Sequence, residues 1–272
     1  MNDAVGSAPG PGAAKVALTR EGPVARLALN RPAQRNPLDR DTIGELRDAV
    51  VLLEAESGVR VVVLSGRGGT FSAGGDLKGY IDLYRQPEAF RRFLADFHDL
   101  LERIERSAKV YVAVIEGYCV AGGLELLLAC DIVVAAESAR IGDAHVNFGQ
   151  LPGAGGSQRL PRTIGPLAAK LLMLTGDIIA AREAERIGLV STVAPDAELD
   201  ARVGALIERV LAASPAGLAG AKHLVNQGMR LDLDAALAME RDYVHRYATT
   251  EPDATEGLLA FQQKRRPRFA GA

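Results

Sequence analysis

The chain has 272 residues, of which 48% are apolar and 24% are charged, and its formal net charge at pH 7 is −2. This length fits one large domain or two small ones, and the apolar fraction is sufficient for a substantial core. The near-neutral charge excludes broad electrostatic attraction to nucleic acid or to an anionic membrane. Basic residues gather at positions 262–269 without an aromatic stacking platform, so we interpret this cluster as a solvated end.

Residues 1–14 are rich in glycine, proline, alanine and serine, and we expect them to form a disordered tail. They lack the pattern of a signal peptide and the arginines of a transit peptide. No apolar run reaches the roughly 18–20 residues that span a bilayer. The only cysteines, Cys119 and Cys130, have a spacing that fits no common zinc site. We therefore expect reduced thiols and a soluble, cytoplasmic protein without a membrane partner.

Short buried strands alternate with amphipathic helices over the first part of the chain. Residues 24–30 alternate in a way that predicts a half-buried strand. Apolar residues at helical spacing predict a helix over 39–57, with Asp39 or Asp41 as its N-cap. The same reasoning predicts strands over 59–66, 109–117 and 131–138, and helices over about 86–106 and 122–129. This order is typical of an α/β fold with parallel strand pairing.

The pattern becomes helical beyond residue 165, where no period-two segment is longer than 189–194. We therefore predict an α/β core over 15–195 and a helical C-terminal region over 196–272.

Two glycine-rich loops follow buried strands, at residues 65–79 and 116–131. Because ligands gather at the carboxyl ends of parallel strands, we expect both loops to border a binding site. A dinucleotide-binding loop is disfavoured, since Phe71 stands where the third glycine of G-x-G-x-x-G belongs, and Gln158 does so in a later glycine-rich stretch. The sequence contains no P-loop motif either.

The loop at 116–131 allows two interpretations. Cys119 lies between a predicted strand and a predicted helix, as the nucleophile of an elbow does, although Ala121 replaces the closing glycine of that motif. A small buried thiol in a turn is the simpler explanation. Alternatively, the backbone N–H groups of Gly75 and Gly122 are donors, because Gly122 begins the predicted helix and its N–H is free. Two such donors that converge on one carbonyl oxygen form an oxyanion hole.

Six stretches form an ordered set of motifs, at residues 30–39, 71–79, 117–132, 149–165, 174–193 and 256–269. Together they resemble the enoyl-CoA hydratase/isomerase, or crotonase, superfamily over about residues 15–269. The resemblance implies a spiral of β-β-α units and a helical C-terminal trimerisation region. It also implies an assembly as a homotrimer or as a dimer of trimers.

The resemblance further implies an acyl-CoA substrate whose thioester carbonyl lies between the N–H groups of Gly75 and Gly122. These groups would stabilise an enolate, which is common to several reactions. The CoA is part of the substrate, and no separate cofactor or metal is implied. The matching positions for substrate and CoA binding are Arg35, Pro37, Ala73, Gly75, Asp76, Leu77, Lys78, Gly122, Phe261 and Lys264. We expect Met173, Leu174 and residues 80–97 to shape the acyl tunnel.

Hydratases of this superfamily hold one water between two glutamates, and Glu125 matches the first of them. The position of the second is occupied by His145, four residues before Gly149. His145 is either a general base that activates water, a hydrogen-bonding group that orients the substrate, or a residue of the pocket wall without a chemical role. Asp143, two residues earlier, is an alternative replacement for the missing glutamate. The remaining histidines, His98, His223 and His245, fit ordinary surface or packing positions.

We therefore predict an enoyl-CoA hydratase-like enzyme that adds water across a 2-enoyl-CoA double bond. The alternatives are an isomerase, which needs a single acid/base group, and an enzyme of CoA thioester hydrolysis or decarboxylation. Two hypotheses from other classes are a non-catalytic binding protein and a hydrolase that depends on Cys119. The sequence leaves the acyl chain length and the stereochemistry open.

Overall fold

The computed structural model describes residues 14–270, and the predicted tail lies outside this range apart from Ala14. Between residues 14 and 270 the chain forms a mixed α/β fold, as predicted. The strands are β1 (Val16–Glu21), β2 (Val24–Leu29), β3 (Val61–Gly66), β4 (Val110–Ile115), β5 (Tyr118–Val120), β6 (Ile132–Ala136), β7 (Arg140–Gly142), β8 (Ile178–Ala180) and β9 (Thr192–Ala194).

The helices include three short 3-10 segments. In chain order they are η1 (Pro32–Gln34), α1 (Arg40–Ala55), α2 (Leu77–Tyr84), α3 (Pro87–Arg106), α4 (Gly122–Leu127), η2 (His145–Phe148), α5 (Gly156–Ile164), α6 (Pro166–Thr175), α7 (Ala181–Arg186), η3 (Asp196–Glu198), α8 (Leu199–Leu211), α9 (Pro215–Gly228), α10 (Leu233–Thr250) and α11 (Pro252–Gln262).

A six-stranded sheet in the order β1-β2-β3-β4-β6-β9 forms the centre of the fold. The predicted parallel pairing is confirmed from β2 to β9, whereas β1, which the sequence pattern missed, is antiparallel to β2. A smaller sheet has the order β5-β7-β8. Each of β4 and β6 in the large sheet leads directly into β5 or β7 in the small one, which gives the predicted succession of paired strands and helices.

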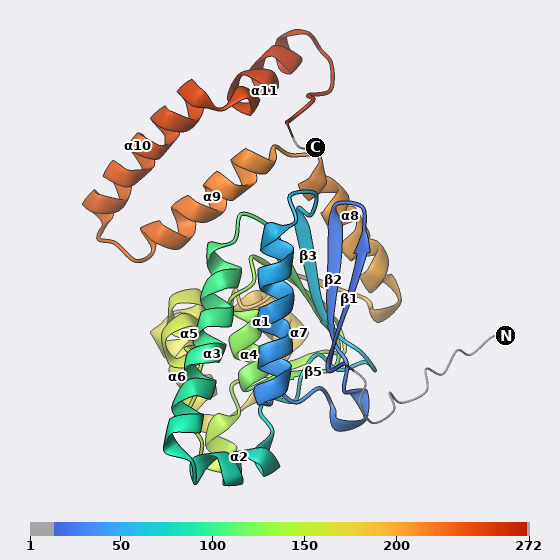
Figure 1. The fold of residues 1–272 in the computed structure, drawn as a ribbon, viewed down its shortest axis with the longest axis vertical. Helices are drawn as coiled ribbons and strands as arrows, with labels where there is room; N and C mark the ends of the chain where they lie inside the picture. The colour runs from blue at the N-terminus through green and yellow to red at the C-terminus, as the bar shows by residue number, and fades with distance from the viewer. Residues whose placement is uncertain (1–13, 271–272) are drawn as a thin grey trace, which may run out of the picture.

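Helices cover both faces of the large sheet (Figure 1). The face that carries Val62 and Leu64 packs against α1, α3 and α4, whereas the opposite face, with Val61 and Val63, packs against α8. The strand β3 is therefore buried on both sides, as its β-branched composition predicts. Helix α8 lies in the predicted C-terminal region, but it packs on the sheet.

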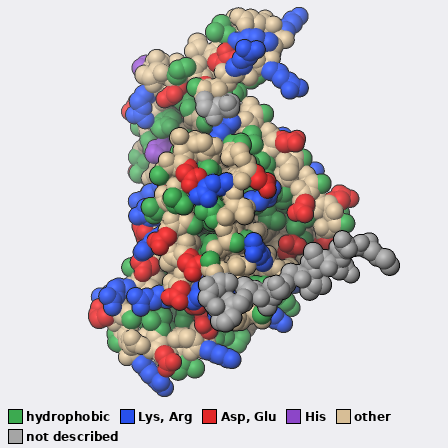
Figure 2. Space-filling view, turned by 45° about the vertical axis from the view of Figure 1, so that its right-hand side comes forward, with side chains coloured by type: hydrophobic (Ala, Val, Ile, Leu, Met, Phe, Trp, Pro, Cys, Tyr) green, Lys and Arg blue, Asp and Glu red, His purple; other side chains and the backbone are tan. Residues whose placement is uncertain are grey.

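Helices α9, α10 and α11 extend beyond the sheet as an arm (Figure 1). We call these three helices the C-terminal arm. Within it, α10 packs along α9, and α11 contacts both. On the face of the molecule in Figure 2, Lys and Arg side chains are interspersed with Asp and Glu side chains.

No single helix between residues 14 and 270 is long and apolar enough to cross a membrane. The segments Asp196–Leu211 and Pro215–Gly228 pass this test only as a pair, and they are bent by 102° relative to each other.

Candidate active site

The two glycine-rich loops meet at the N-terminus of α4. A Cβ placed on Gly74 would lie 2.8 Å from the Cβ of Ala121 and 3.6 Å from the backbone nitrogen of Gly122. Both Gly75 and Gly122 line the same pocket. As the first residue of α4, Gly122 has an N–H group without an intrahelical acceptor. The structure thus brings together the two residues predicted to form the oxyanion hole.

Ala121 precedes this helix in a conformation that is unusual for a residue with a side chain, with φ 51° and ψ −119°. Such conformations cost about 1–3 kcal/mol and tend to occur at functional sites. Here the conformation sets the orientation of the peptide group that carries the Gly122 N–H.

Glu125 lies one turn into α4 and is only 2% exposed. Its Oε1 accepts hydrogen bonds from the N–H groups of Ala154 (2.7 Å) and Gly156 (2.8 Å). A Cβ on Gly156 would lie 3.2 Å from this oxygen, a tight contact that a glycine avoids. Burial raises the pKa of the Glu125 carboxyl, although the two backbone donors and His145 oppose this shift. The carboxyl group is held at one oxygen and free at the other.

The free Oε2 of Glu125 faces His145, the first residue of the short helix η2 (His145–Phe148). The distance between Oε2 and the Nε2 atom of His145 is 3.9 Å. The His145 side chain is 13% exposed and lines the pocket. The structure therefore places His145 beside Glu125 in the pocket that Gly75 and Gly122 line.

Asp143 lies behind His145 and is 1% exposed. Its Oδ1 is 3.1 Å from Nδ1 of His145 and does not reach the pocket, whose lining residues do not include Asp143. Of the two candidates for the missing glutamate, His145 is thus the one that faces the pocket.

The segment 80–97 forms one wall of the pocket, as predicted. Its residues Tyr80, Tyr84, Phe90, Phe93, Leu94 and Phe97 all line it. The prediction for Met173 and Leu174 is wrong, since neither is a lining residue, and Leu174 is 75% exposed. Both lie on α6, and the apolar pattern of the sequence does not show how this helix is oriented relative to the pocket.

Tyr80 is a residue of this wall that the sequence reasoning did not single out. A Cβ on Gly75 would lie 2.3 Å from its hydroxyl oxygen, so the phenol ring lies directly over Gly75. Burial raises the pKa of Tyr80, and the hydroxyl therefore stays protonated as a donor. Between residues 14 and 270 it has no hydrogen-bond partner. It is available to a substrate.

The predicted CoA-binding residues lie in several different parts of the structure. Ala73, Gly75 and Leu77 line the pocket. Asp76 caps α2 by accepting a hydrogen bond from the Gly79 N–H, and Lys78 on the first turn of that helix is exposed.

Arg35 and Pro37 lie on a loop that runs beside the first glycine loop. The carbonyl of Arg35 accepts from the Ala73 N–H at 2.9 Å, and the Leu38 N–H donates to the Gly74 carbonyl at 2.8 Å. The guanidinium of Arg35 lies over the ring of Tyr118 at 5.9 Å.

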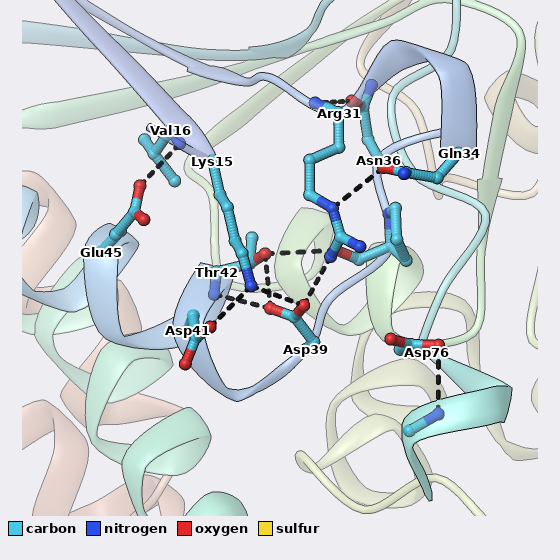
Figure 3. Close-up of polar contacts among 12 residues, drawn as sticks. Lys15, Val16, Arg31, Gln34, Asn36, Asp39, Asp41, Thr42, Glu45 and Asp76 are labelled. Carbon is cyan, nitrogen blue, oxygen red and sulfur yellow. Dashed lines mark hydrogen bonds and ion pairs between the residues drawn. The ribbon is translucent and has the colours of Figure 1, made fainter. Parts of the chain in front are cut away.

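Asp39 anchors the end of this loop (Figure 3). It caps α1 through the Thr42 N–H, as predicted, and it pairs with Lys15 and Arg31. Burial alone would raise the pKa of Asp39, but these hydrogen bonds and charges hold it below its usual value.

Phe261 and Lys264 do not reach the pocket of their own chain. Phe261 is 84% exposed near the end of α11, and α11 packs on α9 and α10. Their contact with CoA stays a prediction.

Cys119 is fully buried in β5 and is absent from the pocket lining. Burial raises the pKa of its thiol well above the usual value. The strained residue of the turn is Ala121, not Cys119. The geometry therefore contradicts a nucleophile elbow at this cysteine.

His98 proves to contact the loop that holds Glu125, because its Nε2 lies 3.0 Å from the Gly153 carbonyl. His223 stacks on Tyr243 in the C-terminal arm, as expected for a packing residue. Residues 14–270 contain no group of His, Cys, Asp and Glu side chains arranged to hold a metal ion.

Comparison with known proteins independently supports the resemblance to the enoyl-CoA hydratase/isomerase superfamily. A family model described as enoyl-CoA hydratase/isomerase matches residues 19–272. The crotonyl-CoA hydratase of Syntrophomonas wolfei is 36% identical over 93% of this chain and 97% of its own length. The 2,3-dehydroadipyl-CoA hydratase of Escherichia coli is 36% identical over 93% of this chain and 98% of its own length.

Solved structures give the same result. The crystal structure of an enoyl-CoA hydratase from Bacillus anthracis superposes with a TM-score of 0.88 at 35% identity, covering 95% of this chain and all of that one. With the motif order, the fold and the paired glycine loops all in agreement, the chain belongs to the enoyl-CoA hydratase/isomerase family.

Proposed function

We propose that this enzyme adds water across the double bond of a 2-enoyl-CoA, with Glu125 and His145 as its two proton-transfer groups. The observation that carries the proposal is the 3.9 Å separation of Glu125 Oε2 and His145 Nε2 inside the pocket that Gly75 and Gly122 border. The curated relatives with hydratase names support the same reaction.

The separation suits a single water molecule. A water oxygen at a hydrogen-bonding distance of about 2.8 Å from both atoms would see them at an angle of about 90°. The site therefore offers one water two polar partners despite the replacement of the second glutamate by a histidine.

The contacts of His145 and Glu125 assign each of them a role in proton transfer. His145 directs Nδ1 toward Asp143, so Nε2 is free to accept a proton from the water. The water oxygen attacks Cβ, and the electron pair of the double bond moves toward the thioester to form an enolate. Glu125, whose pKa burial raises, then donates a proton to Cα.

The enolate oxygen would accept from the N–H groups of Gly75 and Gly122. In other enzymes one such donor contributes about 3–4 kcal/mol to catalysis. Protonated His145 returns its proton to the Glu125 carboxylate through the next water, which restores both groups. Since both transfers use side chains of this chain, no separate cofactor takes part.

The reaction is tested with 2-enoyl-CoA and 3-enoyl-CoA thioesters and the variants Glu125→Gln and His145→Ala. We expect a gain of one water on the 2-enoyl substrate, seen by mass and by loss of the conjugated-enoyl absorbance, and a loss of this activity in both variants. A shift of the double bond without added water, retained in His145→Ala, would establish an isomerase with Glu125 as its only proton carrier.

We also propose that copies of the chain assemble through the C-terminal arm, as trimers or dimers of trimers. The arm exposes large apolar side chains, among them Val225, Met229, Leu233, Leu258 and Phe261. Exposed apolar side chains in this number suit an interaction site. Light scattering checks the mass, and a monomer at micromolar concentration would contradict the proposal.

A further inference from the structure

We propose that Asp143 is a positioning residue that makes His145 a competent base. It binds the Nδ1–H of the imidazole, directs Nε2 toward the water, and stabilises the imidazolium that forms. This inference rests on the proposed hydration and adds a third residue to it.

The backbone after β7 is shaped to bring the two side chains together. The strand ends at Gly142, and Ala144 adopts a left-handed conformation with φ 55°. A residue with a Cβ adopts this conformation rarely. The turn folds His145 back over Asp143, so that Oδ1 lies 3.1 Å from the ring Nδ1 and 3.4 Å from the backbone nitrogen of His145.

Asp143 is buried, and its only backbone donor among residues 14–270 is the N–H of His145. Its Oδ2 has no hydrogen-bond partner among residues 14–270. None of the Lys or Arg side chains in this range pairs with it, and its one ion-pair partner is His145. A buried carboxylate is costly unless a cation or several donors compensate it. When His145 accepts a proton, its imidazolium supplies this positive charge. The ion pair between Asp143 and His145 is therefore strongest after proton transfer, which favours the reaction.

The carboxylate also fixes the tautomer of His145. A carboxylate only accepts hydrogen bonds, so it selects the tautomer with the hydrogen on Nδ1 and a lone pair on Nε2. The Nε2 atom is the one that faces Glu125. An asparagine at position 143 can donate to Nδ1 and so permits the opposite tautomer, in which Nε2 carries the hydrogen and is no longer a base.

The other ionisable groups around His145 are not placed to bind its Nδ1 and fix its tautomer. Glu125 reaches it from α4, and Tyr80 and Tyr84 line the same pocket from α2. No Lys or Arg belongs to the pocket lining. Asp143 is therefore the group placed to bind Nδ1.

The test compares two reactions of the Asp143→Asn variant. Hydration of 2-enoyl-CoA needs both proton-transfer groups, whereas exchange of the Cα protons of a saturated acyl-CoA with deuterated water needs only Glu125 and the oxyanion donors. We expect kcat for hydration to fall about 10²–10⁴-fold, with KM and the exchange rate close to those of the wild type. Nitrogen NMR of labelled histidine should show the change of tautomer.

A second variant covers the case that Asp143→Asn does not fold. Asp143→Ala leaves a space for a small carboxylate, so added formate should restore hydration, whereas it should leave His145→Ala inactive. The proposal is overturned if the Asn variant hydrates like the wild type with an unchanged histidine spectrum. It is equally overturned if hydration and exchange fall together, which would indicate a purely structural role. Failure of the wild type to hydrate any 2-enoyl-CoA would instead refute the proposed function.

Discussion

Arg159 donates a hydrogen bond from its guanidinium to the backbone carbonyl of Ala154 at 2.8 Å. The N–H of Ala154 in turn donates to Glu125. The same guanidinium makes two hydrogen bonds to the carboxylate of Glu105 on α3, and both side chains are 16% exposed. The backbone that donates to the Glu125 carboxyl is therefore held in place by the Arg159–Glu105 ion pair.

From this relationship we predict that Arg159→Lys lowers kcat for hydration by about tenfold or more, because lysine cannot make the two parallel bonds and reach Ala154 as well. Arg162→Lys on the same helix is the matched control, since Arg162 is exposed and donates to the Gln158 carbonyl. Steady-state kinetics of both variants check the prediction. Equal activities for the two variants would show that the Arg159 bonds do not matter for catalysis.

The raised pKa of Glu125 predicts a pH-dependent cost in stability. An unfolded glutamate ionises near pH 4.3, and the buried one ionises at higher pH. As the pH rises between these two values, the unfolded state loses its proton first, so the free energy of unfolding falls. Glu125→Gln removes this effect. We expect the Gln variant to be more stable than the wild type at pH 7 and the difference to shrink below about pH 4.

Thermal unfolding of both proteins across this pH range measures the difference. The control is Glu88→Gln on α3, because Glu88 is exposed. A Glu125→Gln variant that is less stable than the wild type at pH 7 would mean that the ionised carboxyl is compensated better than its burial indicates.

The position of Tyr80 over Gly75 predicts a hydrogen bond to the bound thioester or its acyl group. Tyr80→Phe removes the hydroxyl and keeps the ring, and we expect kcat/KM to fall by about tenfold. Tyr84→Phe is the matched control, since the Tyr84 hydroxyl already donates to Gln150. If both variants behave alike, the Tyr80 hydroxyl does not contact the substrate.

The aromatic wall predicts control over acyl length. Phe90 packs edge-on against Tyr84, with ring centroids 4.8 Å apart. Phe90→Ala opens this part of the pocket, and each additional buried methylene of the substrate is worth about 0.8 kcal/mol, or about fourfold in kcat/KM. We expect the preference to move toward longer acyl chains, measured with a series of 2-enoyl-CoA substrates. Leu167→Ala, on the exposed side of α6, should leave the selectivity unchanged.

The longer elements of the fold were predictable because their apolar periodicity extends over several turns or residues. Helix α1 begins at Arg40 after the predicted cap Asp39, and α3 ends at Arg106 as expected. The strands β5, β7 and β8 have three residues each. Such short segments carry no period of their own, and only pairing with distant strands creates them.

The site was predictable in its residues but not in its contacts. The resemblance to the crotonase superfamily pointed to Glu125, His145 and the two glycines, and all of them line one pocket. The contact between Asp143 and His145 depends on the left-handed Ala144, which nothing in an alanine indicates. The sequence around Arg159 gives no sign of its ion pair, because the partner Glu105 lies 54 positions away in the chain.

The burial of Cys119 predicts that this thiol is dispensable. It lies in β5 between Ser72 and Ile141 and is 0% exposed, and its raised pKa leaves almost no thiolate at neutral pH. We expect Cys119→Ala to keep its hydration activity within about threefold while losing about 1 kcal/mol of stability, since a small cavity replaces the sulfur. Activity and thermal unfolding are measured together, with Cys130→Ala as the control. A folded Cys119→Ala variant without activity, beside an active Glu125→Gln, would instead assign the chemistry to the thiol.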